Sequence, residues 1–258
     1  MKRVLIIPAA GRGSRLDAAI PKLLFPVNGR RMIDFLFDLY APVVDGFILV
    51  VHPSFEGAVR RHCAGWPFPV EYALQGTPTG MLDAILIPRE GIRRAGARSV
   101  WITWCDQIAV RSETVGRLAE LSARHRDAAL IFPTVLRAKP YTHLVRDERG
   151  GIVGIRHRRE GDTLPEVAES DMGLFSLSRE CYLDLLSEFS RELEKGAVTR
   201  ERNFLPFIPW LHGRTKVRTF PGHHEMESVG INTLEELGQV ESYLRDEGKR
   251  AVSHYSGL

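Results

Sequence analysis

Short hydrophobic runs alternate with stretches of helical spacing along the first half of the chain. Nearly continuous apolar runs predict strands that are buried on both faces. Between them, apolar residues recur every three or four positions, as on the inner face of a helix. The predicted strands are residues 3–8, 46–52, 69–75, 99–106 and 128–135. The predicted helices are residues 31–42, 54–63, 80–92 and 112–125, the last with Ser112 as its N-cap.

This alternation predicts an α/β fold with a Rossmann-like, mixed but mostly parallel sheet that is flanked by helices. The pattern changes after about residue 135, although we expect a single domain over residues 1–258. In the second half we predict a hairpin, further strands and a terminal helix that Thr233 and Glu236 cap. Their ranges are 141–158 for the hairpin, 171–178, 216–220 and 225–231 for strands, and 179–196, 203–213 and 233–250 for helical segments.

A glycine-containing loop follows the first predicted strand. Gly11 and Gly13 begin the spacing of a dinucleotide-binding turn, but Leu16 stands where the third glycine belongs. The G-x-x-x-x-G-K-(S/T) spacing of a Walker loop is also missing. Arg15 and Lys22 flank the loop, and glycines allow backbone N–H groups to approach an anion closely. Two cations beside such a loop suit a triphosphate better than a dinucleotide.

Other polar residues follow further strands of the predicted sheet. Gln75 and Gly80 come after the strand 69–75, and Asp106 ends the strand 99–106. In open α/β sheets, ligands bind at the carboxyl ends of the strands. The sequence therefore places the loop and these residues at one candidate site.

Six segments, in order along nearly the whole chain, resemble the nucleotidyltransferases that make nucleotide sugars. The segment PAAGRGSRLDAAIPK (8–22) is similar to that family's A-A-G-x-G-x-R…P-K signature, and EMESVGINTLEEL (225–237) to its E-x-x-G-(V/I)-N motif. The resemblance is greatest to the uridylyltransferase domain of the bifunctional N-acetylglucosamine-1-phosphate enzymes, without their acyltransferase domain. The other segments are LQGTPTGMLDA (74–84), WITWCDQ (101–107), YTHLVRDERGGIVGI (141–155) and SDMGLFSLS (170–178).

The resemblance implies a Mg²⁺-dependent nucleotidyltransferase. A nucleoside triphosphate and a sugar 1-phosphate would give a nucleotide sugar and pyrophosphate, with residues 1–135 as the nucleotide-binding half and 136–258 as the acceptor-binding half. Arg15 would neutralise the leaving pyrophosphate, Lys22 would hold the reacting phosphates, and Asp106 and Asn232 would bind Mg²⁺. The nucleotide-binding residues that it implies are Pro8, Ala9, Ala10, Gly11, Gly13, Gln75, Gly80 and Met81.

The base and the acceptor stay open at this point. The Gln75 amide can accept from N3–H of uracil or thymine, or donate to cytosine, so UTP, CTP and dTTP are favoured alike. Several acceptor positions depart from the family pattern, so a cytidylyltransferase for a non-sugar phosphate or phosphonate is the alternative. The expected acceptor-binding residues are Thr142, His157, Glu169, Asp171, Gly173 and Glu227. The basic side chains of Arg137, Lys139 and Arg156 either face an anion or lie in a solvated hairpin.

Other protein classes fit less well. A glycosyltransferase of related architecture would carry Asp-x-Asp where this chain has Trp104-Cys105-Asp106, and a non-catalytic nucleotide-sugar-binding regulator is the third reading. The net charge of +3 is too small to indicate a nucleic-acid partner, and no stretch is apolar enough to predict a membrane span. Three widely spaced cysteines favour a reducing compartment, the cytoplasm. His223, His224 and Glu225 lack the spacing of a zinc site. The oligomeric state is left open.

Overall fold

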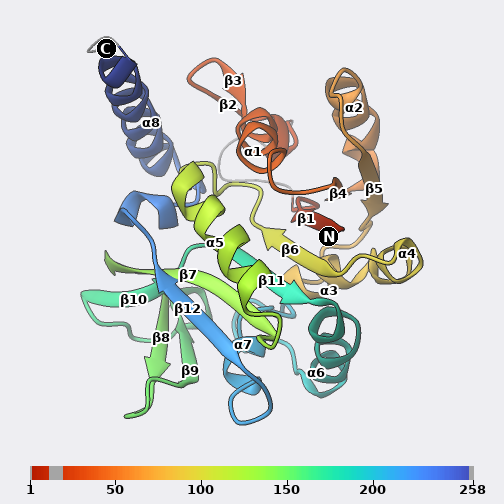
Figure 1. The fold of residues 1–258 in the computed structure, drawn as a ribbon, viewed down its shortest axis with the longest axis vertical. Coiled ribbons are helices and arrows are strands. Elements are labelled where there is room, and N and C mark those ends of the chain that lie inside the picture. Colours follow the sequence, from red (N-terminus) through yellow and green to blue (C-terminus); the bar gives the residue numbers. More distant parts are fainter. Residues whose placement is uncertain (1, 12–19, 256–258) are drawn as a thin grey trace.

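The central sheet begins with four parallel strands. The structure is a computed structural model that describes residues 2–11 and 20–255, with side chains up to residue 247. Strand β1 (Arg3–Pro8) pairs in parallel with β4 (Gly46–Val51) and with β6 (Ser99–Thr103), and β4 pairs in parallel with β5 (Val70–Leu74). These are the strands predicted from the apolar runs of the first half, which lie beside one another in Figure 1.

Strands from the second half extend the same sheet beyond β6. Strand β11 (Leu174–Ser178) pairs antiparallel with both β6 and β7 (Leu130–Ala138). Strand β10 (Val167–Asp171) pairs antiparallel with β7, and β12 (Val217–Pro221) pairs parallel with it. The order is β10-β7-β11-β6-β1-β4-β5, with β12 beside β7. The predicted α/β fold with a mixed, mostly parallel sheet is confirmed.

Helices cover both faces of the sheet, which explains why its strands are apolar throughout. Leu5 and Ile7 pack among residues of α1 (Met32–Tyr40), α2 (Pro53–Cys63) and α5 (Ser112–Arg124), together with α8 (Leu234–Tyr255). Val4 and Ile6 point to the opposite face. The elements on that face are α3 (Met81–Leu86), α4 (Arg89–Ala95), the π-helical turn η3 (Cys181–Leu185), α6 (Leu186–Glu192) and α7 (Phe207–Trp210).

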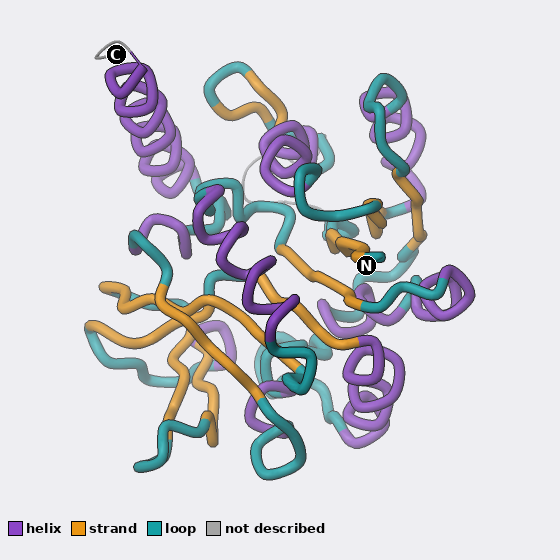
Figure 2. The backbone as a smooth tube through the Cα atoms, viewed as in Figure 1, coloured by secondary structure: helices purple, strands orange, loops and turns teal. Residues whose placement is uncertain are grey.

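Two hairpins of the described chain lie outside this sheet. Strands β8 (Thr142–Arg146) and β9 (Ile152–His157) form the predicted hairpin, which extends away from the β7 and β10 end of the sheet in Figure 2. It continues into a 3-10 turn, η2 (Arg158–Glu160). The smaller hairpin joins β2 (Pro26–Val27) to β3 (Arg30–Arg31) through Asn28 and Gly29, both at positive φ, as a type I′ turn requires.

Several predicted features differ from the structure. The helix predicted over residues 80–92 is divided into α3 and α4, because Pro88 lies at the joint and cannot donate a helical hydrogen bond. The helix predicted over 179–196 ends at Glu192 rather than at Gly196. Arg111, not Ser112, is the N-cap of α5. The predicted strand 225–231 instead begins as a 3-10 turn, η4 (Glu225–Ser228), and joins no strand of the sheet.

The buried carboxylate of Glu227 accounts for that last difference. It accepts backbone hydrogen bonds from His223 and His224, at 2.8 and 2.9 Å, which curls the chain into η4. Its other oxygen accepts from the Arg111 N–H at 2.9 Å and the Thr114 hydroxyl at 2.6 Å, at the start of α5. One fully buried carboxylate therefore attaches the segment after β12 to the start of α5.

We expect Glu227→Ala to lower the free energy of unfolding by about 3 kcal/mol, because it leaves several donors without an acceptor in a buried position. Chemical denaturation measures the change. The matched control is Glu225→Ala in the same turn, where the side chain is exposed and the expected change is within about 0.5 kcal/mol. Equal stability of the two variants would contradict the anchoring role of Glu227.

Candidate active site

A cavity of about 430 Å³ lies at the carboxyl ends of β1, β5 and β6. Residues that follow these strands form one side of it: Pro8 to Gly11 after β1, Gln75 after β5, and Trp104 to Gln107 after β6. The opposite side comes from the β8–β9 hairpin and from β10. The structure therefore brings residues 8–11, at the start of the glycine loop, and segments from the second half of the chain to one cavity, at the edge of the sheet that the sequence predicts.

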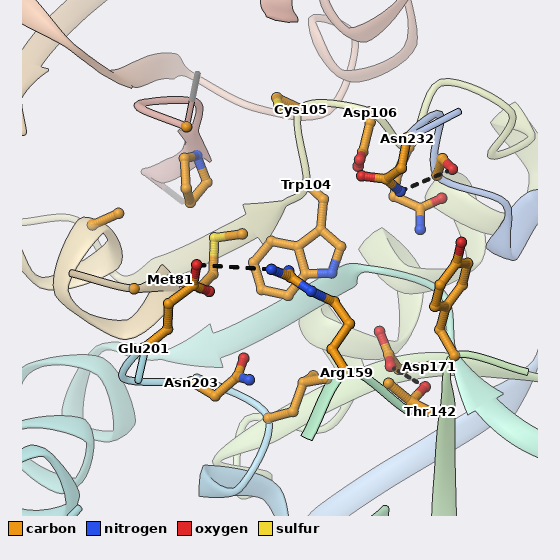
Figure 3. Close-up of a pocket in the computed structure, with 18 of the residues that line it drawn as sticks. Met81, Trp104, Cys105, Asp106, Thr142, Arg159, Asp171, Glu201, Asn203 and Asn232 are labelled. Carbon is orange, nitrogen blue, oxygen red and sulfur yellow. Dashed lines mark hydrogen bonds and ion pairs between the residues drawn. The ribbon is translucent and has the colours of Figure 1, made fainter. Parts of the chain in front are cut away.

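Three polar side chains from distant parts of the chain meet at this cavity. Lys22 belongs to the 3-10 turn η1 (Lys22–Leu24), Asp106 follows β6, and Asn232 precedes α8. The Lys22 ammonium donates to the Asp106 carboxylate at 2.5 Å and to the Asn232 amide oxygen at 2.8 Å. Figure 3 shows the side chains of Asp106 and Asn232 next to one another. Burial alone would lower the pKa of Lys22, but the nearby Asp106 charge raises it above its ordinary value.

The position of Asn232 is fixed by the start of α8. Glu236 accepts from the backbone N–H groups of Asn232 and Thr233, at 2.8 and 3.0 Å, and its own N–H donates to the Thr233 hydroxyl at 3.2 Å. This is the predicted capping box, which is confirmed. Because these bonds hold the backbone on both sides of the Asn232 Cα, they fix the point from which its side chain extends toward Lys22.

The oxygen atoms of Asp106 and Asn232 could together hold a hard cation. They converge on one point, which the Lys22 ammonium occupies. A Cβ on Gly230 would lie 3.1 Å from the Asp106 carboxylate, so the chain here packs closely against it. The described residues contain no group of three or more His, Cys, Asp or Glu side chains that could hold a metal. A set of two protein oxygens suits Mg²⁺, which takes its other ligands from phosphates and water.

The predicted base-binding residues line the same cavity. Gln75 is buried, and its amide N–H₂ approaches the Gly80 carbonyl at 3.4 Å. Gly80 has a φ of +137°, and a Cβ there would overlap the backbone of Arg202, so no other residue fits. Met81, the first residue of α3, lines the cavity beside it. Pro8, Ala9, Ala10 and Gly11 also line it, whereas Gly13 and Arg15 lie outside the described residues.

At the other end of the cavity, Asp171 is held by two hydrogen bonds. The Thr142 hydroxyl donates to one carboxylate oxygen at 2.9 Å, and the Gly173 N–H donates to the other at 2.9 Å. Burial raises the pKa of Asp171. His157 lines the cavity on the same hairpin; burial lowers the pKa of its imidazole, and its buried Nδ1 has no hydrogen-bond partner among the described residues. Thr142, His157 and Asp171 thus come together as predicted.

The other three predicted acceptor residues do not line the cavity. Glu169 forms an ion pair with Arg146 at 2.6 Å, which holds the pKa of the carboxyl below its ordinary value despite its burial. Gly173 has a positive φ and leaves room for the indole of Trp104, which a Cβ would overlap. Glu227 is the anchor described above. These residues support the wall of the cavity rather than face into it.

Sequence reasoning missed several residues that the structure places in the cavity. Glu201 and Asn203 come from the segment between α6 and α7, where no motif indicates a site. The Arg159 guanidinium reaches Glu201 at 3.8 Å, and this pair is drawn in Figure 3. Of the three basic residues that the sequence considers, Arg137 lines the cavity and Lys139 and Arg156 do not. Trp104 and Tyr141 are among the other lining residues that were missed.

Comparison with known proteins identifies the class to which this fold and cavity belong. Residues 5–171 match the model of the MobA-like NTP transferase domain. This span is more than half of the chain, so the chain belongs to the family of MobA-like NTP transferase domains and is a nucleotidyltransferase. The predicted resemblance to nucleotidyltransferases is confirmed.

Among the described residues, no helix has both the length and the apolar character to cross a membrane.

Several curated relatives carry the name bifunctional protein GlmU. The chain is 27% identical to GlmU of Pelotomaculum thermopropionicum over 253 residues, which are 95% of this chain and 52% of that protein. It is 27% identical to GlmU of Thermotoga maritima over 251 residues, 94% of this chain and 51% of the relative. For GlmU of Acholeplasma laidlawii the identity is 22% over 255 residues, with 95% and 52% covered. The chain therefore spans about half the length of these relatives.

We expect Lys22→Met to raise the affinity of the nucleotide-free protein for Mn²⁺ about tenfold, because the ammonium no longer occupies the point where the two oxygens meet. Mn²⁺ binding is measured by electron paramagnetic resonance. Lys216→Met is the matched control, since it removes an exposed Lys–Asp pair with the same 2.5 Å separation. An unchanged or weaker affinity in Lys22→Met would show that Asp106 and Asn232 do not form a cation site.

Proposed function

We propose that this protein transfers a nucleotidyl group from a pyrimidine nucleoside triphosphate to a sugar 1-phosphate and releases pyrophosphate. The observation that carries the proposal is the meeting of Lys22, Asp106 and Asn232 in one cavity. Residues Gln75 and Gly80 lie at one end of this cavity and Thr142 and Asp171 at the other. The relatives named GlmU and the family match support a sugar-phosphate nucleotidyltransferase in general.

The reaction joins two anions, so the protein must supply positive charge and alignment more than proton transfer. A phosphate oxygen of the acceptor attacks the α-phosphorus in line, and the bond to the departing pyrophosphate breaks. Lys22 would hold the reacting phosphates, and Arg15, outside the described residues, would neutralise the pyrophosphate. Asp106 and Asn232 would hold Mg²⁺, which when bound withdraws charge from the phosphate oxygens. Backbone N–H groups of Ala10 and Gly11 would face the triphosphate.

Base selection would depend on Gln75 and Gly80. The buried amide of Gln75 can accept from N3–H of uracil or thymine, or donate to N3 of cytosine. The close approach of the Arg202 backbone to Gly80 gives the base end a rigid wall. The proposed pyrimidine preference rests on this amide and on the resemblance to uridylyltransferases.

A second candidate is a cytidylyltransferase that acts on a non-sugar phosphate or phosphonate. The acceptor end of the cavity favours it. The Thr142 hydroxyl already donates its hydrogen bond to Asp171, and the Asp171 carboxylate already accepts hydrogen bonds from Thr142 and Gly173. Fewer groups are then left to read the hydroxyls of a sugar. A glycosyltransferase or a non-catalytic regulator is the alternative of another class, and neither would release pyrophosphate.

We expect pyrophosphate release when one of UTP, CTP or dTTP is combined with a phosphorylated acceptor and Mg²⁺. The assay crosses these and ATP and GTP with sugar 1-phosphates, small phosphomonoesters and phosphonates. Asp106→Asn and Arg15→Met should each reduce turnover at least about 100-fold, since charge stabilisation carries the reaction.

Asp127→Asn is the control, because it changes an exposed aspartate that pairs with Lys216. Full turnover by both Asp106→Asn and Arg15→Met would overturn the proposal. Binding of nucleotide without pyrophosphate release across the whole panel would favour the regulator instead.

A further inference from the structure

Arg137 is a cavity residue to which the resemblance assigns no role. It lies on β7, and it lines the cavity. The guanidinium is half-buried, and this burial lowers its pKa, although neighbouring acidic groups act in the opposite direction. Removing a guanidinium from water has a cost that an anion must offset.

The other described cations of the cavity each have a carboxylate partner. Lys22 pairs with Asp106 at 2.5 Å and Arg159 with Glu201 at 3.8 Å. Arg137 forms no ion pair with any described residue; its hydrogen bond is to the Ser228 carbonyl at 2.9 Å. Its guanidinium also lies 5.4 Å from the ring of Tyr141. A guanidinium carries five N–H donors, so most of the donors of Arg137 have no acceptor in the described chain.

The neighbours of Arg137 place it between the catalytic centre and the acceptor end. The Ser228 carbonyl that it contacts is also approached by the amide of Gln107, next to Asp106, at 3.4 Å. Two residues further on, Gly230 packs against the Asp106 carboxylate. On the other side, Tyr141 precedes Thr142 at the start of β8 and donates to Glu236, which positions Asn232.

We propose that Arg137 binds the phosphoryl or phosphonyl group of the acceptor and holds it toward the α-phosphate of the nucleotide. This inference rests on the proposed function and adds the residue that recognises the attacking group. The planar fork of a guanidinium matches two oxygens of a phosphate or phosphonate. Among the described residues, Lys22 is paired with Asp106 and Arg159 with Glu201, so Arg137 is the cavity cation whose charge has no carboxylate partner and can meet the acceptor dianion. Uncharged acceptors would leave it unpaired and are therefore rejected.

Two measurements test the inference. In the pyrophosphate-release assay, Arg137→Met is expected to raise the KM for the acceptor at least about 30-fold and leave the KM for the triphosphate unchanged, since a charged hydrogen-bonded contact is lost. Arg137→Lys keeps the charge without the fork and should lie between Arg137→Met and the wild type. Binding of inorganic phosphate and of methylphosphonate to the nucleotide-free protein is measured by ³¹P NMR, and Arg137→Met should weaken both by a similar factor.

The matched control is Arg149→Met, an exposed arginine in the turn of the β8–β9 hairpin, which should leave all these values unchanged. Circular dichroism confirms that each variant is folded. An unchanged acceptor KM with unchanged phosphate binding in Arg137→Met overturns the inference, as does an equal rise in the KM for the triphosphate. If no pair of substrates releases pyrophosphate but phosphate binding still depends on Arg137, the proposed function fails while the anion site stands.

Discussion

The parallel pairing of β1 with both β4 and β6 is the constraint on which the rest of the site depends. Parallel strands end at the same edge of a sheet, so the segments that follow β1 and β6 must leave side by side. Helices bury both faces of these strands, so a ligand can reach the strands at their carboxyl ends but not across the faces of the sheet. Asp106 is carried to the cavity in this way, and the glycine loop that leads to Lys22 starts from the same edge.

The second half of the chain completes the site by a different principle. Asn232 follows no strand of the sheet, and it reaches Asp106 because Glu227 curls the preceding segment and Glu236 caps α8 immediately afterwards. Two buried or nearly buried carboxylates thus determine where a neutral amide lies. The Arg202 backbone against Gly80 is a similar case, in which a segment late in the sequence forms the wall behind an early loop. Remote hydrogen bonds, rather than sheet register, set these positions.

The hydrophobic pattern predicted the parallel strands and the fold class, because strands that are buried on both faces are apolar at nearly every position. The family motifs indicated that Thr142 and Asp171 share one region and that Lys22, Asp106 and Asn232 share another, but not the hydrogen bonds between them. The turn η4 could not be predicted, because it is caused by the hydrogen bonds of Glu227. A single buried carboxylate does not change the hydrophobic periodicity from which the elements were predicted. Glu201, Asn203 and Arg159 were missed for a related reason: they belong to irregular segments whose place is decided by contacts such as Arg202 with Asp83. Gly13 and Arg15 lie outside the described residues, so their roles stay predictions.

The insertion of β11 between β6 and β7 has a consequence for how the chain is made. Strand β6 is synthesised long before Leu174–Ser178, yet β11 is its neighbour on one side. As the protein emerges from the ribosome, β1, β4, β5 and β6 can assemble while one edge of β6 keeps its backbone N–H and C=O groups unpaired. That edge stays open to a wrong partner until some seventy further residues have been added, a delay that lasts seconds at the usual rates of translation. The open edge of β6, the strand that carries Asp106 to the cavity, is therefore one place where aggregation during synthesis would begin.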